Sequence, residues 1–154
     1  IDVTELAAQI NSEYSPQASE KGLAFNLDIG GRLGVVKVSR LYLEEILQNF
    51  ITNAIRYTQK GSITLSIKKN KSGEITFKVI DTGIGISKAD MAKIFDKFYR
   101  AEDYRTRETK GTGLGLYVSA KLAKKLGCKI EVESRLNHGS TFGFKLKEFK
   151  NNDK

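Results

Sequence analysis

One carboxylate in this chain stands where it could bind the amino group of a ligand. The run Asp81-Thr-Gly-Ile-Gly-Ile86 follows residues 75–80, in which apolar side chains alternate with polar ones. That alternation predicts a strand with one buried face. Gly83 and Gly85 let the chain turn at positive φ and let another molecule approach the backbone closely. We therefore expect Asp81 to end a strand and to accept hydrogen bonds in a pocket, with a plain turn as the alternative.

Two asparagines on a predicted helix offer a different chemistry. Asn49 and Asn53 are four residues apart in the helix expected through about Thr58, with Arg56 and Tyr57 one turn further on. Residues at this spacing lie side by side on a helix surface. Asparagine is a poor helix former, and its amide oxygen suits a hard cation such as Mg²⁺. A pair of exposed or locally bonded amides is the alternative interpretation.

A second glycine cluster lies at the start of another predicted helix. The run Gly111-Thr-Gly-Leu-Gly-Leu116 follows the highly charged residues 101–110, for which a surface loop is expected. Glycines at a helix N-terminus expose backbone N–H groups at the positive end of the helix dipole. The sequence therefore predicts an anion-binding segment here.

The elements that must position these groups follow from the spacing of apolar residues. We expect helices at 2–21, from Ser39 to about Thr58, after Ser87 and from 116 to Gly127. Alternation and short apolar runs bounded by turn residues predict strands at 23–29, 33–38, 62–69, 74–81, 129–134 and 140–146. Pro16 is expected to kink or interrupt the first helix. One mixed sheet with helices on one face, an α+β two-layer sandwich, is the economical layout.

Composition bounds the possible functions. The 154 residues suffice for one domain, and 26 Lys and Arg against 18 Asp and Glu give a net charge of +8. This surplus favours polyanions, but the lysines of 68–71 and 145–150 lie at strand ends and in the tail, and aromatic residues are not interleaved with them in a nucleic-acid-binding pattern, so we expect no nucleic-acid partner. One Cys and one His cannot build a tetrahedral zinc site. A P-loop, a dinucleotide-binding glycine fingerprint and a nucleophile elbow are absent.

Two further observations concern the compartment. A single cysteine, Cys128, suits reducing conditions, and no apolar run approaches the roughly 20 residues that span a bilayer. A cytoplasmic location is therefore expected. Because the sequence begins with Ile1 and not with Met, we also expect a piece of a longer protein.

Four stretches in order resemble the N, G1, F and G2 boxes of the catalytic ATP-binding domain of two-component sensor histidine kinases. They are residues 49–58, 81–86, 95–100 and 111–116. Residues 138–142 also resemble that family's last Gly-Thr-Thr-Phe element. The resemblance covers nearly the whole chain and implies the Bergerat-type ATP-binding fold shared with gyrase, Hsp90 and MutL. It implies a domain over 1–150 with a tail at 151–154.

The resemblance also implies a role for each matching residue. Asp81 would bind the adenine amino group, with Gly83 and Gly85 shaping this end and Tyr57 flanking the base. Asn49 and Asn53 would hold Mg²⁺, and Asn49 and Arg56 would serve catalysis, with Arg56 reaching toward phosphate. The further nucleotide-binding residues implied are Arg100, Lys110, Gly111, Gly113, Leu114, Gly115 and Thr141.

The implied activity is transfer of the γ-phosphate of Mg-ATP to a histidine on a phosphoacceptor helical hairpin, with a response regulator downstream. The resemblance implies a monomeric fragment of a homodimeric, membrane-anchored kinase. Two alternatives of the same fold stay open, a hydrolytic ATPase and a non-catalytic docking module. Hydrolytic relatives place a Glu one turn before the Mg²⁺-binding Asn, where this chain has Asn49, and an amide cannot act as a general base. The retained Asp81 and Asn53 argue against a mere docking module.

Overall fold

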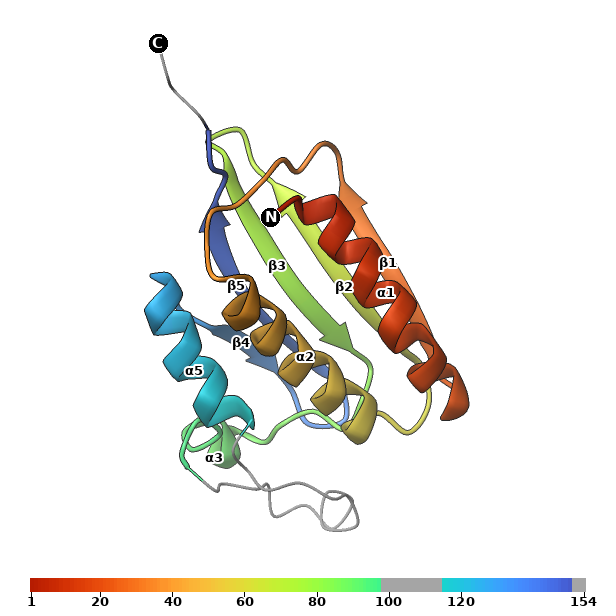
Figure 1. Ribbon diagram of the computed structural model, residues 1–154. Helices are drawn as coiled ribbons and strands as arrows, with labels where there is room; N and C mark the ends of the chain where they lie inside the picture. The colour runs from red at the N-terminus through yellow and green to blue at the C-terminus, as the bar shows by residue number, and fades with distance from the viewer. Residues whose placement is uncertain (98–114, 151–154) are drawn as a thin grey trace.

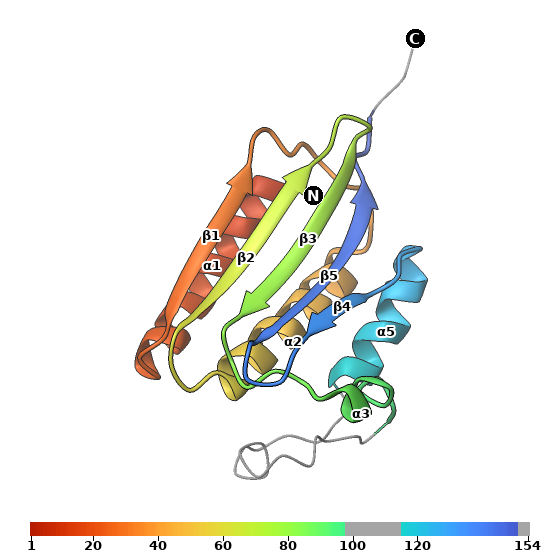
Figure 2. The ribbon, with the colours of Figure 1, turned by 180° about the vertical axis from the view of Figure 1, so that it is seen from behind.

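The computed structural model describes residues 1–97 and 115–150, which form one mixed sheet with helices on one face (Figure 1). Its strands lie in the order β1-β2-β3-β5-β4. They are β1 (Ala24–Gly30), β2 (Ser62–Lys69), β3 (Glu74–Asp81), β4 (Glu131–Ser134) and β5 (Ser140–Lys147). Only β1 and β2 pair in parallel. Figure 2, seen from behind, shows the other face of the sheet with no described helix over it. The expected α+β sandwich is confirmed.

Three long helices cover the sheet, and a short one follows the Asp81 loop. They are α1 (Val3–Glu20), α2 (Arg40–Tyr57) and α5 (Gly115–Leu126), with α3 (Lys88–Met91) as the short helix. Helix α1 packs on β1, and α2 packs beside α5 (Figure 1). Ser39 caps α2 as predicted, because its hydroxyl accepts a hydrogen bond from the Tyr42 N–H at 3.3 Å. Within the described chain no helix is both long and apolar enough to cross a bilayer.

The core fixes where α2 lies over the sheet. The face of α2 predicted to be apolar is buried, and its members are Leu43, Ile46, Leu47, Phe50, Ile51 and Ala54. The ring of Phe50 lies 5.4 Å from that of Phe142 on β5, and Phe77 of β3 stacks on Phe144 at 5.0 Å between centroids. Such aromatic contacts bury large areas and prefer defined geometries. They hold α2 across β3 and β5, so its asparagine stripe lies beside α5.

The hairpin formed by β2 and β3 places Asp81 at the end of the core. Ile75, Phe77 and Val79 of β3 are buried on the helix-covered face. Asp81 is the next residue in this period of two, so its side chain points to the same face, beyond the last core residue. In the turn, the side-chain Oδ1 of Asn70 accepts hydrogen bonds from the N–H groups of Ser72 and Glu74 at 3.0 and 2.9 Å. The Asn70 turn and the pairing of β2 with β3 therefore favour the same hairpin register, which fixes the position of Asp81.

Two predictions about the first forty residues are corrected by the structure. Helix α1 is one continuous element with Pro16 inside it, so the predicted interruption is wrong, whereas the kink expected as its alternative stays a prediction. Residues 33–38 form no strand; Val35 makes only an isolated bridge to Asp2. Gly34 has a φ of +80°, which breaks the extended conformation. The apolar pattern of this segment comes from packing instead, because Leu33 and Val36 are buried and anchor the connection to α2.

Candidate functional site

The Asp81 carboxylate is fixed through one of its oxygens. Its Oδ1 accepts hydrogen bonds from the Gly83 N–H at 2.9 Å and from the Ser140 N–H at 3.2 Å. Among the described residues, no group donates to Oδ2. Burial raises the pKa of this carboxyl above its ordinary value, and the two backbone hydrogen bonds oppose that shift without cancelling it. The result is an oriented acceptor with one oxygen open to a ligand.

Three glycines allow the backbone around Asp81 to pack closely. Gly85 and Gly139 have φ values of +71° and +86°. A β-carbon on Gly85 would lie 2.0 Å from the Arg135 carbonyl oxygen, and one on Gly139 would lie 2.1 Å from the Asp81 carbonyl oxygen. Gly83 is not at positive φ, contrary to expectation, but a β-carbon there would lie 2.5 Å from the Tyr57 carbonyl oxygen. All three positions therefore exclude a side chain, because a neighbouring carbonyl group already occupies the space that a β-carbon would need.

The two asparagines lie together, facing the start of α5. The Asn49 amide nitrogen donates to the Gly115 carbonyl at 3.3 Å and to the Ser119 hydroxyl at 3.0 Å. A β-carbon on Gly115 would lie 3.9 Å from Asn49 Oδ1 and 4.0 Å from Asn53 Nδ2, so both amides border the same space. Asn49 Oδ1 has no partner among the described residues. It is an acceptor available to a cation.

The last turn of α2 joins the amide pair to the Asp81 loop. The Arg56 guanidinium donates to Asn53 Oδ1 at 3.1 Å, and the Tyr57 carbonyl accepts the Ile84 N–H at 3.2 Å. Lys21, at the end of α1, donates its ammonium to the carbonyls of Ile55 and Arg56 at 2.6 and 2.9 Å. These carbonyls belong to the helix C-terminus, where cations are favourable. Burial, with a smaller contribution from Arg56, lowers the pKa of Lys21.

The donor set fits a nucleotide-bound Mg²⁺ better than a metal held by protein alone. Among the described residues, no three His, Cys, Asp or Glu side chains gather to form a metal site. Mg²⁺ in nucleotide sites keeps waters and takes only one or two protein oxygens besides the phosphates. Asn49 Oδ1 has no hydrogen-bond partner among the described residues, whereas Asn53 Oδ1 accepts a hydrogen bond from Arg56 at 3.1 Å. The residues present therefore fit this ion in company with phosphates.

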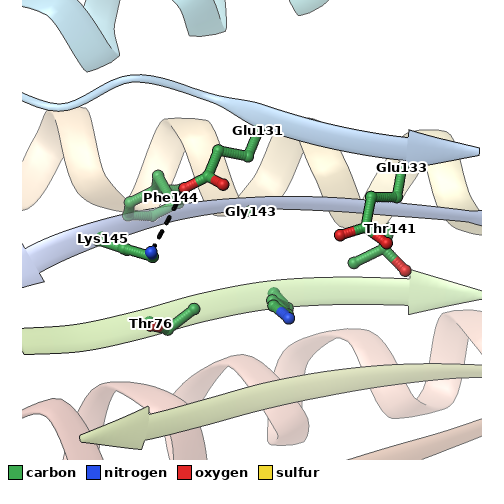
Figure 3. A pocket seen from close by; sticks show the side chains of 8 residues that line it. Thr76, Glu131, Glu133, Thr141, Gly143, Phe144 and Lys145 are labelled. Carbon is green, nitrogen blue, oxygen red and sulfur yellow. Dashed lines mark ion pairs between the residues drawn. The ribbon is translucent and has the colours of Figure 1, made fainter. Parts of the chain in front are cut away.

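Thr141 is not brought to the site, which corrects the expectation for this residue. It pairs with Ile80 on the uncovered face and lines a shallow hollow of about 250 Å³ there. Figure 3 shows it beside Glu133 on this face, with Glu131 and Lys145 further along. Ser140, one residue earlier, is paired with Asp81 and donates to it. Consecutive residues of a strand point to opposite faces of the sheet, so Thr141 and Ser140 cannot both face the site. The motif indicated Thr141, whereas the residue beside Asp81 is Ser140.

Other expected residues divide into two groups. Arg100, Lys110, Gly111, Gly113 and Leu114 lie outside the described residues. Asp81, Gly83, Gly85, Asn49, Asn53, Arg56, Tyr57 and Gly115 are brought together around the C-terminal end of α2. Sequence reasoning missed Ser140 and the buried Thr58 beside Gly83. Only the register of β5 against β3, which pairs Ser140 with Asp81, could have indicated Ser140.

Comparison with known proteins agrees with this geometry. Residues 39–150 match the family described as histidine kinase-, DNA gyrase B-, and HSP90-like ATPase. The chain is 38% identical over 144 residues to the aerobic respiration control sensor protein ArcB of Escherichia coli, covering 92% of this chain and 18% of ArcB. It is 34% identical over 146 residues to the sensor protein SrrB of Staphylococcus aureus, covering 94% of this chain and 24% of SrrB. The chain thus spans less than a quarter of these relatives.

Solved structures give the same result for the fold. Full-length ShkA in complex with AMPPNP superposes with a TM-score of 0.83 at 30% identity, over 94% of this chain and 30% of that one. The nucleotide-free catalytic domain of the histidine kinase ThkA has a TM-score of 0.80 at 24% identity, over 96% of this chain and 95% of that one, which shows the fold alone. The chain belongs to the family of histidine kinase-, DNA gyrase B- and HSP90-like ATPases, and within it to the catalytic domains of sensor histidine kinases.

Proposed function

We propose that this domain binds Mg-ATP and donates the γ-phosphate to a histidine on a phosphoacceptor helical hairpin of the same kinase. The observation that carries the proposal is the Asp81 carboxylate, fixed by two backbone N–H groups through Oδ1 and open at Oδ2. The end of α2 that bears Asn53 is tied to the Asp81 loop by the Tyr57–Ile84 hydrogen bond. The complex of ShkA with AMPPNP supports a nucleotide ligand.

At the base end, the chemistry of Asp81 selects the ligand. An ionised carboxylate only accepts hydrogen bonds, so Oδ2 suits the exocyclic amino group of adenine. Guanine carries a carbonyl oxygen in the corresponding position, and two acceptors facing each other would repel. Tyr57, half-buried at the end of α2, would flank the base. Gly83 and Gly85 lack side chains, which allows the loop backbone to lie close to the carbonyl groups of Tyr57 and Arg135.

At the phosphate end, Asn49 and Asn53 would hold Mg²⁺ through their amide oxygens. When bound, the ion supplies positive charge that stabilises the phosphoryl group during transfer. In the described arrangement Asn53 Oδ1 is engaged by Arg56 at 3.1 Å. If the Asn53 oxygen turns to the cation, the Arg56 guanidinium loses this acceptor and is free to bind phosphate oxygens. Arg56 would then position the phosphate chain by charge-assisted hydrogen bonds.

Hydrolysis fits the site less well than transfer to a protein side chain. Asn49 stands one helical turn before Asn53, and its amide nitrogen is committed as a donor to α5. An amide has no lone pair basic enough to take a proton from water. Glu45 is exposed and lies one further turn back, about 6 Å along the helix axis. No carboxylate on α2 is therefore placed to activate water.

The extent of the domain and its setting are part of the same proposal. Residues 1–150 would form the domain with a tail at 151–154, because α1, although outside the matched range, contributes Val3, Leu6 and Ile10 to the common core. We propose that the parent kinase is a membrane-anchored homodimer whose catalytic domain lies in the cytoplasm, and that it signals to a response regulator. The names of the relatives, which call them sensor proteins, support the signalling part of this proposal.

The test combines binding with transfer. Calorimetric titration with a non-hydrolysable ATP analogue, with and without Mg²⁺, should show binding that the metal strengthens. ATP labelled at the γ-phosphate should then label the parent kinase's hairpin domain, added as a separate polypeptide. Absence of nucleotide binding refutes the proposal. Binding without labelling favours a docking module, and release of free phosphate without the hairpin favours a hydrolytic ATPase.

A further inference from the structure

Thr58 carries a hydroxyl that the fold itself does not use. The residue ends α2, directly after Tyr57, and its exposed fraction is 0%. Its Oγ1 is the one buried side-chain polar atom of the described residues without a hydrogen-bond partner. Keeping a buried hydroxyl unpaired is unfavourable, and native proteins rarely do so without a reason such as a bound water or ligand. A valine would fill the same volume with no polar atom to satisfy.

The position of this hydroxyl links it to the ligand-binding carboxylate. The point that a β-carbon on Gly83 would occupy lies 2.7 Å from Thr58 Oγ1 and 3.0 Å from Asp81 Oδ1. The two oxygens therefore border the same part of the Asp81 loop, although they share no direct hydrogen bond. A hydroxyl can both donate and accept, so one water can be bound between it and a carboxylate.

We propose that Thr58 is a positioning residue for Asp81, whose hydroxyl gains its hydrogen bond when nucleotide binds, through one water shared with the carboxylate. In this arrangement the Thr58 hydroxyl donates to the water, and the water donates to Asp81. The water's remaining hydrogen-bonding capacity faces the edge of the base. The inference rests on the proposed nucleotide function and adds a residue to its base end. Thr58 does not touch the phosphates in this arrangement, so its effect is independent of Mg²⁺.

Two pairs of variants isolate the hydroxyl. Thr58→Val keeps the shape and removes the oxygen, and Thr58→Ser keeps the oxygen and removes a methyl group. Thr58→Ala is compared with Thr58→Ser, because these two differ only in the hydroxyl. If Thr58→Val does not fold, the comparison of Thr58→Ala with Thr58→Ser still shows whether the hydroxyl contributes to binding. Thr76→Val, on the uncovered face of β3, is the control for a threonine remote from the site.

The measurements are calorimetric affinity for an ATP analogue with and without Mg²⁺, and thermal unfolding without nucleotide. We expect Thr58→Val and Thr58→Ala to weaken binding by roughly 3- to 15-fold, the loss of one hydrogen bond, by the same factor with and without metal. Thr58→Ser and Thr76→Val should bind as the unchanged protein does. The unfolding midpoint of Thr58→Val should not fall, because no existing hydrogen bond is lost.

The outcomes separate this inference from the function it rests on. If the unchanged protein binds the analogue and Thr58→Val binds it equally well, Thr58 is structural and the inference is overturned while the proposed function stands. A loss seen only with Mg²⁺, or an equal loss in Thr58→Ser, also overturns it. If the unchanged protein binds no nucleotide, both fail.

Discussion

Replacing Asp81 with Asn tests the base end of the site with the smallest change of shape. The amide oxygen can still accept from the N–H groups of Gly83 and Ser140, which now donate to Oδ1. The change therefore affects the position of Oδ2, where an accepting oxygen is replaced by a donating NH₂ group. Adenine presents its own amino group there, so two donors face each other. The loop contacts survive, and the complementarity to the base is lost.

The size of the effect follows from that geometry. A hydrogen bond to a charged acceptor contributes more than a neutral one, and an opposed donor adds a desolvation penalty. Together they amount to about 2–4 kcal/mol. At about 1.4 kcal/mol per tenfold change, affinity should fall by roughly 30- to 700-fold. The measurement is calorimetric titration of Asp81→Asn with an ATP analogue.

Stability of the unliganded domain should respond in the opposite sense. Burial raises the native pKa of Asp81 above that of the unfolded chain. The native state then holds this proton more tightly, so the contribution of Asp81 to stability falls as pH rises from the unfolded pKa through the native pKa. Above the native pKa, the ionised group makes the fold less stable than a group with an unshifted pKa would. The neutral amide avoids this, so the unfolding midpoint of Asp81→Asn should stay equal or rise.

The same raised pKa predicts how binding depends on pH. As pH falls, the carboxyl takes up a proton at a higher pH than an ordinary Asp does, and Oδ2 loses acceptor strength. As pH falls, affinity in the unchanged protein should therefore begin to weaken at a higher pH than it would with an ordinary Asp, and Asp81→Asn should lack this component. Asp28→Asn is the matched control, since Asp28 is an exposed carboxylate on β1 paired with Lys68 at 3.1 Å. Unchanged affinity in Asp81→Asn, or an equal loss in Asp28→Asn, would refute the reasoning.

Three further predictions concern other parts of the site. Asn53→Ala should lose the Mg²⁺-dependent part of nucleotide affinity and keep the rest; equal loss with and without metal removes Asn53 from the ligands. Gly139→Ala, with a β-carbon 2.1 Å from the Asp81 carbonyl oxygen, should destabilise the fold by about 2–4 kcal/mol in chemical denaturation, whereas Gly127→Ala, at φ +79° with nothing within 4 Å, should cost about 1–2 kcal/mol. Similar losses in the two glycine variants would contradict the close contact. Thr141→Val should leave nucleotide affinity unchanged, and a tenfold loss would contradict its outward placement.

Local patterns predicted the parts of the site that lie within single elements. The hairpin was predicted at 62–69 and 74–81, and the structure has the same bounds, because strand alternation and the Asn70 turn agree there. Residues 33–38 were also predicted as a strand because apolar and β-branched residues are frequent there, but the buried Leu33 and Val36 anchor a connection between elements. A short apolar run indicates burial, and burial alone does not distinguish a strand from a buried connection.

Positions set by pairing between distant segments could not be read from the chain. Whether Ser140 or Thr141 faces Asp81 depends on the register of β5 against β3, which local sequence leaves open. The Thr58 hydroxyl likewise lacks a partner because the end of α2 packs against Gly83 in the Asp81 loop, a contact that local sequence does not reveal. Both residues became visible only when segments about sixty and twenty-five residues apart were brought together.

The two ends of the site differ in how ready they are for a ligand. At the base end, Asp81 Oδ1 is already held by two N–H groups, and glycine contacts fix the loop, so little ordering remains to oppose binding. At the phosphate end, Arg56 donates a hydrogen bond to the Asn53 oxygen, so in the proposed function a cation that binds this oxygen would first break that hydrogen bond. The break would release the Arg56 guanidinium to the incoming phosphates. In the proposed function, metal binding and phosphate binding would therefore be coupled through Arg56, whereas recognition of the base would depend on neither.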